Sequence, residues 1–468
     1  MPDFKLLLIT DTHYFASKLG CRGEAYDEFM KYKQKCFAET EAINRAAFAW
    51  LNETDLADTV LIAGDLSFNG EKESHLEFIE LLKDLKAHGK KIYVITAGHD
   101  CNEHPFAFDE TGRLEPEGTP REELFDLYYE FGFKDAIAVD RENLSYVAQL
   151  APGLRLLALN NDGGPNRTHT YTARQIEWIL QQTKKAREEN QTMIAMNHYP
   201  LLPGVPLFGL LGKEVVMKNA DYITAMLADE GVHLCFTGHM HNQAVNVRET
   251  EKGNRFYDVC TGSLIGCPAC MRLVSFTENY NKVDIRTLPV PDFDWDLQGL
   301  TKDEYFKRQF DMMINTYLTS MRDDPARFLG KLGLKEAPDA LKSVVGRVGG
   351  FLNGATVGKL CGFFRVSCPA EIRDMLFVDL ARELVRNCFT GDAPYVYGTP
   401  EHAAIMGAAN RLAKVVKIEI NGKTAGPDGA FDSSGLCDGD NKISITANQN
   451  RLLNIYLEWD QEANGAEL

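Results

Sequence analysis

Short apolar runs alternate with amphipathic segments over the first 290 residues of the chain. Each run has the length of a strand, whereas the segments between them repeat their apolar positions at helical spacing. Ile176, Ile179 and Leu180, for example, share one face of a segment that is otherwise rich in charge. We therefore expect strands at 5–10, 58–64, 90–98, 144–150, 154–160, 191–197 and 232–238, with helices at about 39–52, 72–88, 172–189 and 215–230.

This alternation predicts βαβ units, in which helices cover a sheet. One pair of runs differs, because a Pro-Gly turn at 152–153 joins them as a hairpin. Two prolines interrupt the pattern near 288–296, after which helical spacing dominates and short strands follow at the end of the chain. We expect an α/β domain at 1–292, a mostly helical accessory region at 293–415 and a small β-rich segment at 416–468.

The acidic composition restricts the partners. A net charge of −17 and a pI near 5.2 disfavour a nucleic-acid polymer or an anionic membrane, since both require a basic surface. A small anionic substrate remains compatible, because bound cations reverse the charge inside a pocket. No stretch approaches the ~20 apolar residues of a membrane span.

The cysteines and the N-terminus favour a reducing compartment. Eleven cysteines have no repeating spacing, and Cys235 and Cys260 lie inside apolar runs. The first residues, MPDFKLLLITDTH, read as a strand and not as a signal peptide. Cys267 and Cys270 form a CPAC pair with no second pair, so redox or metal chemistry there is disfavoured. We expect a cytoplasmic protein.

Five strand ends carry carboxylates and imidazoles. The ends of parallel strands share one rim of an open α/β sheet, and ligands bind at that rim. Side chains of this kind, without thiolates, suit divalent Mn, Fe or Zn. In DTH and HMH the paired residues are two apart, so on an extended segment both would face one ion. The candidates are Asp11, His13, Asp65, His99, Asp100, His198, His239 and His241.

The series DTH, GDLS, GHD, NHYP and GHMH resembles the motifs of the calcineurin-like metallophosphoesterases, and most closely their cyclic-nucleotide-phosphodiesterase-like branch. The resemblance covers about 1–290. It implies a four-layer α/β/β/α sandwich with two divalent metal ions between its sheets, and 1–292 as the catalytic domain. Carried over by motif, the first ion takes Asp11, His13, Asp65 and His241, and the second takes Asp65, His198 and His239.

One ligand of the family pattern is missing. The family has asparagine in GNHD, whereas this chain has AGHD, which places Gly98 at the asparagine position. We expect water or Asn102 to fill the gap and the second ion to bind more weakly than the first. Restoring asparagine at position 98 is then expected to strengthen binding of the second ion.

The resemblance also implies a reaction. A hydroxide that bridges the two ions attacks phosphorus, and His99 serves as general acid or hydrogen-bond donor at the leaving group, oriented by Asp100. The alternative role of Asp100 is to cap the N-terminus of a helix in the segment that follows. We expect hydrolysis of a small phosphodiester, with a nucleotide as candidate substrate. The alternatives are a phosphomonoesterase acting on a protein or small metabolite, and a non-catalytic binding module with a degraded second metal site.

Several further residues have weaker signals. By resemblance, Ser263, Pro268 and Arg272 shape the pocket wall. Arg167 and His169 lie in a polar loop that could contact substrate, although a solvated loop is the simpler interpretation. The remaining histidines belong to no motif and are predicted to be structural or solvated: His75, His88, His104, His233 and His402. The oligomeric state and the role of 293–468 stay open.

Overall fold

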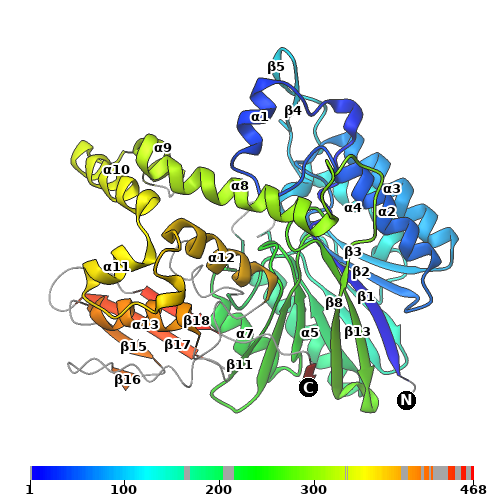
Figure 1. The fold of residues 1–468 in the computed structure, drawn as a ribbon. Coiled ribbons are helices and arrows are strands. Elements are labelled where there is room, and N and C mark those ends of the chain that lie inside the picture. Colours follow the sequence, from blue (N-terminus) through cyan, green and yellow to red (C-terminus); the bar gives the residue numbers. More distant parts are fainter. Residues whose placement is uncertain are drawn as a thin grey trace.

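Two large sheets form the centre of the N-terminal part of the molecule, and a helical region extends to one side of it (Figure 1). The computed structural model describes residues 3–162, 169–203, 216–331, 334, 336–391, 399–412, 416–420, 423–424, 441–447, 455–459 and 465–467.

The first sheet contains the N-terminal strand at its centre. β1 pairs parallel with β2 and β2 parallel with β3, whereas the strands on the other side of β1 run antiparallel. Its order is β19 (Gly465–Glu467), β14 (Lys282–Pro289), β13 (Cys270–Thr277), β1 (Phe4–Ile9), β2 (Thr59–Ala63) and β3 (Lys91–Ile95).

The second sheet is also mixed. Its four central strands are parallel, and β7 and β8 form the predicted antiparallel hairpin. The order is β11 (Ala244–Glu249), β12 (Arg255–Cys260), β10 (Leu234–Thr237), β9 (Thr192–Met196), β8 (Leu154–Ala158), β7 (Ser145–Ala151) and β6 (Ala138–Asp140).

Alternation along the strands reveals four layers. In β8, Leu154 and Leu156 lie in the large core cluster that joins the two sheets, whereas Leu157 lies in a second cluster with the helices behind the sheet. The helices that cover the outer faces are α2 (Thr40–Glu53) and α3 (Lys72–Ala87) on the first sheet, and α5 (Ala173–Glu188) and α7 (Ala220–Asp229) on the second. The α/β/β/α sandwich expected from the resemblance is confirmed.

An insertion lies between β1 and α2. It contains α1 (Glu24–Met30) and packs on the hairpin of β4 (Ala107–Asp109) and β5 (Gly112–Leu114). Phe37 in this insertion stacks on Phe68 from the loop after β2, with ring centroids 3.9 Å apart. Beyond the hairpin, the short helix α4 (Leu124–Leu127) precedes β6.

The C-terminal part is mostly helical and ends in strands, as predicted. Its longest helix, α8, begins with a capping box in which Thr301 and Glu304 each bond the other's backbone N–H. The helices are α8 (Lys302–Asp323), α9 (Pro325–Lys331), α10 (Asp339–Gly354), α11 (Val357–Phe364), α12 (Phe377–Thr390) and α13 (Pro400–Leu412). The small sheet has the order β16 (Lys423–Thr424), β15 (Val416–Ile420), β17 (Asn441–Ala447) and β18 (Ile455–Trp459).

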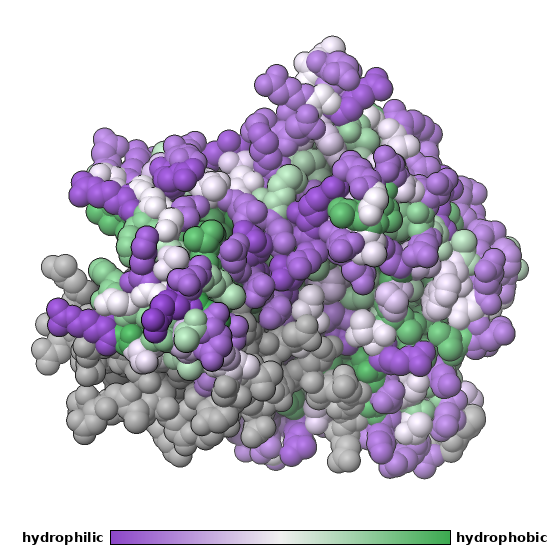
Figure 2. Space-filling model, viewed as in Figure 1, coloured by the Kyte–Doolittle hydropathy of each residue, from purple (hydrophilic) through white to green (hydrophobic). Residues whose placement is uncertain are grey.

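Hydrophilic residues cover most of the visible face, and apolar patches lie both over the helical region and over the sandwich (Figure 2). Large exposed apolar side chains of the helical region include Val348, Phe351 and Phe363. An apolar pocket of about 530 Å³ opens among α10 to α13. Within the described ranges, no helix has both the length and the apolar character needed to cross a membrane.

Candidate metal centre

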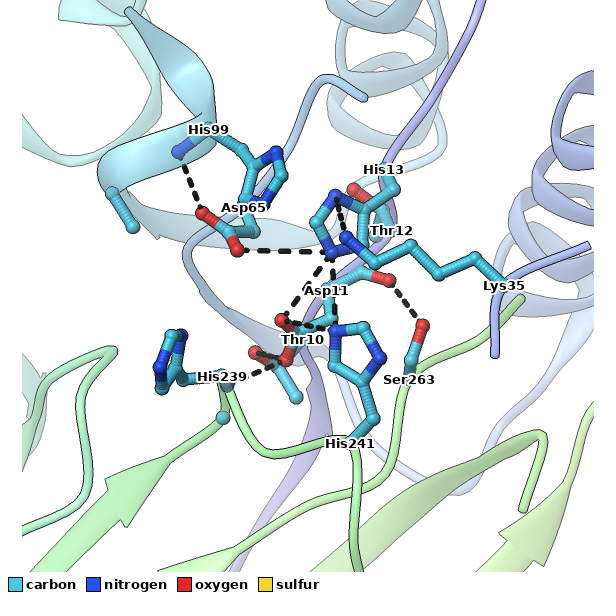
Figure 3. A network of polar contacts seen from close by, with 12 residues as sticks. Thr10, Asp11, Thr12, His13, Lys35, Asp65, His99, His239, His241 and Ser263 are labelled. Carbon is cyan, nitrogen blue, oxygen red and sulfur yellow. Dashed lines mark hydrogen bonds and ion pairs between the residues drawn. The ribbon is translucent and has the colours of Figure 1, made fainter. Parts of the chain in front are cut away.

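The ends of β1, β2, β3, β9 and β10 meet between the two sheets (Figure 3). All six predicted metal ligands converge there. His13 Nε2 lies 3.5 Å from an oxygen of Asp11 and 3.7 Å from an oxygen of Asp65. His241 Nε2 lies 3.1 Å from the same Asp11 oxygen, and His198 Nε2 lies 3.0 Å from Asp65.

The ligand atoms form three overlapping groups, each of a size that could hold an ion: Asp11–His13–His241, His13–Asp65–His99 and Asp65–His198–His239. The third equals the set carried over for the second ion, and the first contains the set carried over for the first ion without Asp65. They also correct the spacing argument for HMH, because His239 and His241 belong to different groups and so do not face one ion.

The backbone at the site explains this division. Five of the six candidates have positive φ: Asp11 at 50°, His13 at 37°, Asp65 at 51°, His239 at 65° and His241 at 54°. The DTH and HMH segments are therefore not extended, as the spacing argument assumed. Left-handed conformations cost L-residues on the order of 1 kcal/mol each and accumulate at functional sites, where the surrounding structure holds them.

Two glycines permit the close approach of these loops. Gly64 has a φ of +90°, and a Cβ there would lie within 3.0 Å of His198. A Cβ on Gly238 would lie 2.0 Å from the Thr10 hydroxyl and 2.5 Å from a carboxylate oxygen of Asp11. The neighbouring N–H of His239 instead donates to Asp11 at 3.0 Å, which fixes the loop after β10 against the end of β1.

The imidazoles are oriented through their Nδ1 atoms. The Ala63 carbonyl lies 2.8 Å from Nδ1 of His198, and the Ser67 carbonyl lies 3.3 Å from Nδ1 of His13. The side-chain oxygen of Gln34 lies 3.0 Å from Nδ1 of His241. For His198 and His241 these contacts place a proton on Nδ1 and leave Nε2 as the atom that faces the centre. Such partners commonly fix the tautomer and the direction of metal-binding histidines.

The charges at the site favour a cation. Burial opposes ionisation of Asp11 and Asp65, yet the surrounding histidines hold the pKa of both carboxyls well below the usual value. His198 shows the reciprocal effect: despite its burial, Asp65 and Asp11 raise its pKa to about 9. The two carboxylates thus stabilise a positive charge on His198 although this side chain is buried.

The donor set fits divalent metal ions. Asp11 Oδ1 and His198 Nε2 are buried, and their nearest polar neighbours are other candidate ligand atoms, His241 Nε2 at 3.1 Å and an Asp65 oxygen at 3.0 Å. Because these atoms contact mainly each other, a cation in the centre is the partner that would satisfy both. Carboxylate oxygen and imidazole nitrogen suit Mn, Fe or Zn equally, so the donors do not select among these metals.

The asparagine position of the family is occupied by Gly98, as the sequence indicates. Asn102 does not fill the gap, because its side-chain oxygen accepts the backbone N–H of His104 at 3.0 Å. Its backbone exchanges two hydrogen bonds with Thr119. Asn102 therefore stabilises its own turn.

His99 lies at the edge of the centre and is half-buried. Its Nδ1 is 2.7 Å from the carbonyl of Phe68, and its backbone N–H donates to Asp65 at 3.0 Å. Nε2 is therefore the free face of the ring. Burial, with Lys35 nearby, lowers the pKa of His99 to about 4, so the ring is neutral at pH 7 before an anion binds.

The predicted contact between Asp100 and the His99 ring is wrong. The Asp100 carboxylate instead accepts the backbone N–H groups of Leu66 at 2.7 Å, Ser67 at 2.9 Å and Ala97 at 2.7 Å. These bonds satisfy a buried carboxylate better than one imidazole could. Asp100 thus ties the loop after β2 to the loop after β3 and positions His99 only through the backbone.

Two functional candidates were missed in the sequence, Gln34 and Lys35. Gln34 accepts from His241 and donates to the carbonyl of Cys267 at 2.7 Å. Lys35 Nζ lies 3.2 Å from Nδ1 of His13 (Figure 3). Both belong to the insertion before α2, and no motif marks them. A lysine aimed at a metal centre supplies a cation that a phosphate oxygen can use.

The remaining candidates serve the walls of the site. Ser263 donates to the carbonyl of Asp11 at 2.6 Å, and the buried Arg272 donates to the Cys260 carbonyl at 2.8 Å. The Cys267–Pro268 peptide is cis, and all ten cysteines of the described part are free. His169 is half-buried with its ring 4.4 Å from that of Tyr199, and Arg167 lies outside the described residues.

The unassigned histidines lie away from the centre. His75 is buried, with its ring nitrogens 2.6 Å from the Tyr128 hydroxyl and 2.8 Å from the Asp100 carbonyl. It therefore supports the loop that carries His99. The others contact backbone or surface groups or lie in the helical region: His88, His104, His233 and His402.

The fold and the site together define a metallohydrolase of the α/β/β/α class. The family model of the calcineurin-like phosphoesterases matches residues 4–243, just over half of the 468-residue chain. The chain belongs to this family, and it is a metal-dependent phosphoester hydrolase. The enzyme interpretation thus prevails over the non-catalytic binding module.

Solved structures similar to this chain share little sequence with it. A dimetal phosphatase from Danio rerio is 12% identical, with a TM-score of 0.42 over 62% of this chain and 97% of that one. The purple acid phosphatase PPD1 from yellow lupin seeds is 12% identical, with a TM-score of 0.39 over 63% and 52%. The NAD nucleotidase of Haemophilus influenzae is 14% identical, with a TM-score of 0.29 over 76% and 62%. No curated protein matches the sequence.

Proposed function

We propose that the protein hydrolyses a small phosphodiester, with a nucleotide as the candidate substrate, at the centre around Asp65. The observation that carries the proposal is the position of Asp65: it belongs to the group with His198 and His239, and it also groups with His13, a member of the Asp11–His13–His241 group. One oxygen of Asp65 lies 3.0 Å from His198 Nε2 and 3.7 Å from His13 Nε2. A carboxylate in that position is suited to join two neighbouring ions.

Each protein group has a separate task in this proposal. Asp11, His13, Asp65 and His241 would hold the first ion, and Asp65, His198 and His239 the second. Two such ions supply a hydroxide nucleophile at neutral pH and neutralise charge on the phosphoryl oxygens. Burial of the carboxylates keeps competing water away from them, because both are at most 2% exposed.

His99 would protonate the leaving oxygen. Its Nδ1 is engaged by the Phe68 carbonyl, so Nε2 is the atom available to the substrate. An anionic phosphoester beside Nε2 favours a second proton on the ring. Donation of that proton to the leaving oxygen restores the neutral tautomer that the Phe68 carbonyl stabilises.

A comparison of aryl substrates tests the proposal. The Mn-loaded protein is assayed with bis(p-nitrophenyl) phosphate and with p-nitrophenyl phosphate, with Asp65→Ala as the inactive control. We expect kcat/KM to be higher for the diester, and activity to be lost in the control. A higher kcat/KM for the monoester would overturn the diester assignment. Rates in Asp65→Ala equal to those of wild type would show that hydrolysis does not occur at the centre around Asp65.

One observation favours a phosphomonoesterase as the second candidate. Lys35 Nζ lies beside His13, and a monoester carries one more negative charge than a diester at neutral pH. If Lys35 binds that charge, Lys35→Met raises KM for a monoester by about tenfold, since each 1.4 kcal/mol is a factor of ten in binding.

Lys33→Met is the matched control, because the Lys33 ammonium lies over the Phe29 ring at 4.4 Å from its centroid. The kinetics of both variants with the diester show whether the metal centre itself is intact. If Lys35→Met leaves the monoester KM at the value of the control, Lys35 does not recognise the substrate.

A further inference from the structure

Tyr199 lies where the missing asparagine of the second metal position would be. A Cβ placed on Gly98 would be 2.7 Å from the Tyr199 hydroxyl oxygen and 3.9 Å from the ring carbon that carries it. An asparagine side chain at position 98 would therefore collide with the hydroxyl. The ring carbon alone would be at ordinary contact distance.

The hydroxyl oxygen also matches the reach of an asparagine oxygen. Standard bond lengths place the amide oxygen of asparagine about 2.4 Å from its Cβ. The Tyr199 oxygen is 2.7 Å from the corresponding point above Gly98. An oxygen donor is thus present within the reach of an asparagine side chain at position 98, but it comes from a different loop.

Tyr199 is held firmly in this position. Its backbone N–H donates to the Asn161 side chain at 3.2 Å, and its carbonyl accepts from Asn161 at 3.0 Å. The two imidazoles of the second ligand group flank it, with ring centroids 4.3 Å away for His239 and 5.3 Å for His198. Tyr199 is only 5% exposed.

We propose that the Tyr199 hydroxyl replaces the asparagine side chain as the oxygen donor of the second metal position. The inference rests on the proposed function, because it assumes an ion at Asp65, His198 and His239. Unlike an amide, a phenol bound to a divalent cation readily loses its proton, so the exchange adds a negative charge to the ligand set. Gly98 and Tyr199 are then a matched pair, since the tyrosine hydroxyl leaves no room for an asparagine side chain at position 98.

This pairing changes the expectation for Gly98→Asn. On the sequence alone, the substitution restores a ligand and strengthens binding of the second ion. In the structure, the new Cβ collides with the Tyr199 oxygen at 2.7 Å. The single variant is therefore expected to bind the second ion no better than wild type. In Gly98→Asn/Tyr199→Phe the oxygen is absent, and the asparagine can enter.

Calorimetric titration of the metal-free protein with Mn²⁺ tests the pair. Wild type is compared with Tyr199→Phe, Gly98→Asn and Gly98→Asn/Tyr199→Phe. We expect Tyr199→Phe to weaken the second binding event at least tenfold, and the double variant to regain wild-type affinity. The matched control is Tyr146→Phe, which removes the hydroxyl of another buried tyrosine, one that donates to the Val94 carbonyl at 2.9 Å.

The outcomes separate this inference from the proposed function. If wild type binds two ions and Tyr199→Phe binds the second as tightly, the inference is overturned while the dinuclear site stands. If the double variant is no better than Tyr199→Phe, the pairing is overturned. If wild type binds no second ion, the proposed function fails first. Unchanged thermal unfolding and an unchanged first binding event show that each variant is folded.

Discussion

The role of His99 depends on which ring nitrogen faces the substrate. With Nδ1 at 2.7 Å from the Phe68 carbonyl, only Nε2 can deliver a proton. Proton donation matters most when the leaving oxygen is a poor leaving group, because a stabilised phenolate departs without help. The identity of the leaving group therefore distinguishes an acid from a residue that merely binds phosphate.

His99→Gln should lower kcat by a factor of about 10²–10⁴ for an alkyl phosphodiester, and much less for a p-nitrophenyl one. Steady-state kinetics with both substrates measure this difference. His104→Gln is the control, because His104 is exposed and bonds a surface carboxylate, Glu115. Equal losses for the two substrates would contradict the acid role.

At this scale, the sequence identified residues that lie in motifs and missed those that reach the site from elsewhere. The six predicted ligands converge because each follows a strand end, which periodicity reveals. Lys35 was missed because a lysine in an insertion has no positional signal. The Asp100 contact was misjudged because a carboxylate next to a histidine can equally bond backbone N–H groups, and only the loop geometry decides.

At the scale of elements, α8 braces the insertion that carries Gln34 and Lys35. The Gln309 side chain donates to the backbone carbonyls of Met30 at 3.2 Å and Lys33 at 2.8 Å. Tyr305 donates to the buried carboxylate of Glu39. We propose that the helical region at 293–415 serves the catalytic domain at 1–292 by holding this insertion against the metal centre.

Gln309→Ala should loosen the insertion. We expect KM to rise severalfold with less change in kcat, because Lys35 would lose its fixed position while the ligands stay in place. Thr316→Ala is the control, since its hydroxyl bonds only the Met312 carbonyl within the same helix at 2.8 Å. A KM equal to that of the control would show that α8 does not position the insertion.

The strands and helices of the sandwich were predictable because their apolar positions repeat with a clear period. The predicted run 58–64 is β2 at Thr59–Ala63, and the predicted helix 72–88 is α3 at Lys72–Ala87. The insertion before α2 was not placed, because its aromatic residues pack on partners distant in the sequence, as Phe37 does on Phe68. Periodicity does not report such contacts.

At the scale of the whole molecule, buried Glu71 should make stability depend on pH. Burial raises its pKa from 4.5 to about 7, against backbone hydrogen bonds and the charge of Lys35, which lower it. The folded protein therefore holds a proton that the unfolded chain releases. The contribution of Glu71 to the free energy of unfolding is complete below pH 4.5 and is lost, by up to about 3 kcal/mol, as the pH rises through about 7.

Glu71→Gln should remove this decrease and stabilise the protein above pH 7. Urea unfolding at pH 5 and pH 8 measures the effect, with Glu80→Gln as the control on an exposed carboxylate of α3. We expect a smaller change in unfolding free energy between the two pH values for Glu71→Gln than for the control. The same change in both would contradict it.

The central claim is that one carboxylate, Asp65, joins two metal positions in a single centre. The most direct measurement is the number of manganese ions per chain, by elemental analysis after dialysis, in wild type and in Asp65→Ala. Asp140→Ala is the control, because Asp140 is a buried carboxylate that accepts a hydrogen bond from the Asn143 side chain and belongs to none of the ligand groups. We expect two ions in wild type and in the control, and fewer than one in Asp65→Ala. Two ions retained in Asp65→Ala would contradict it.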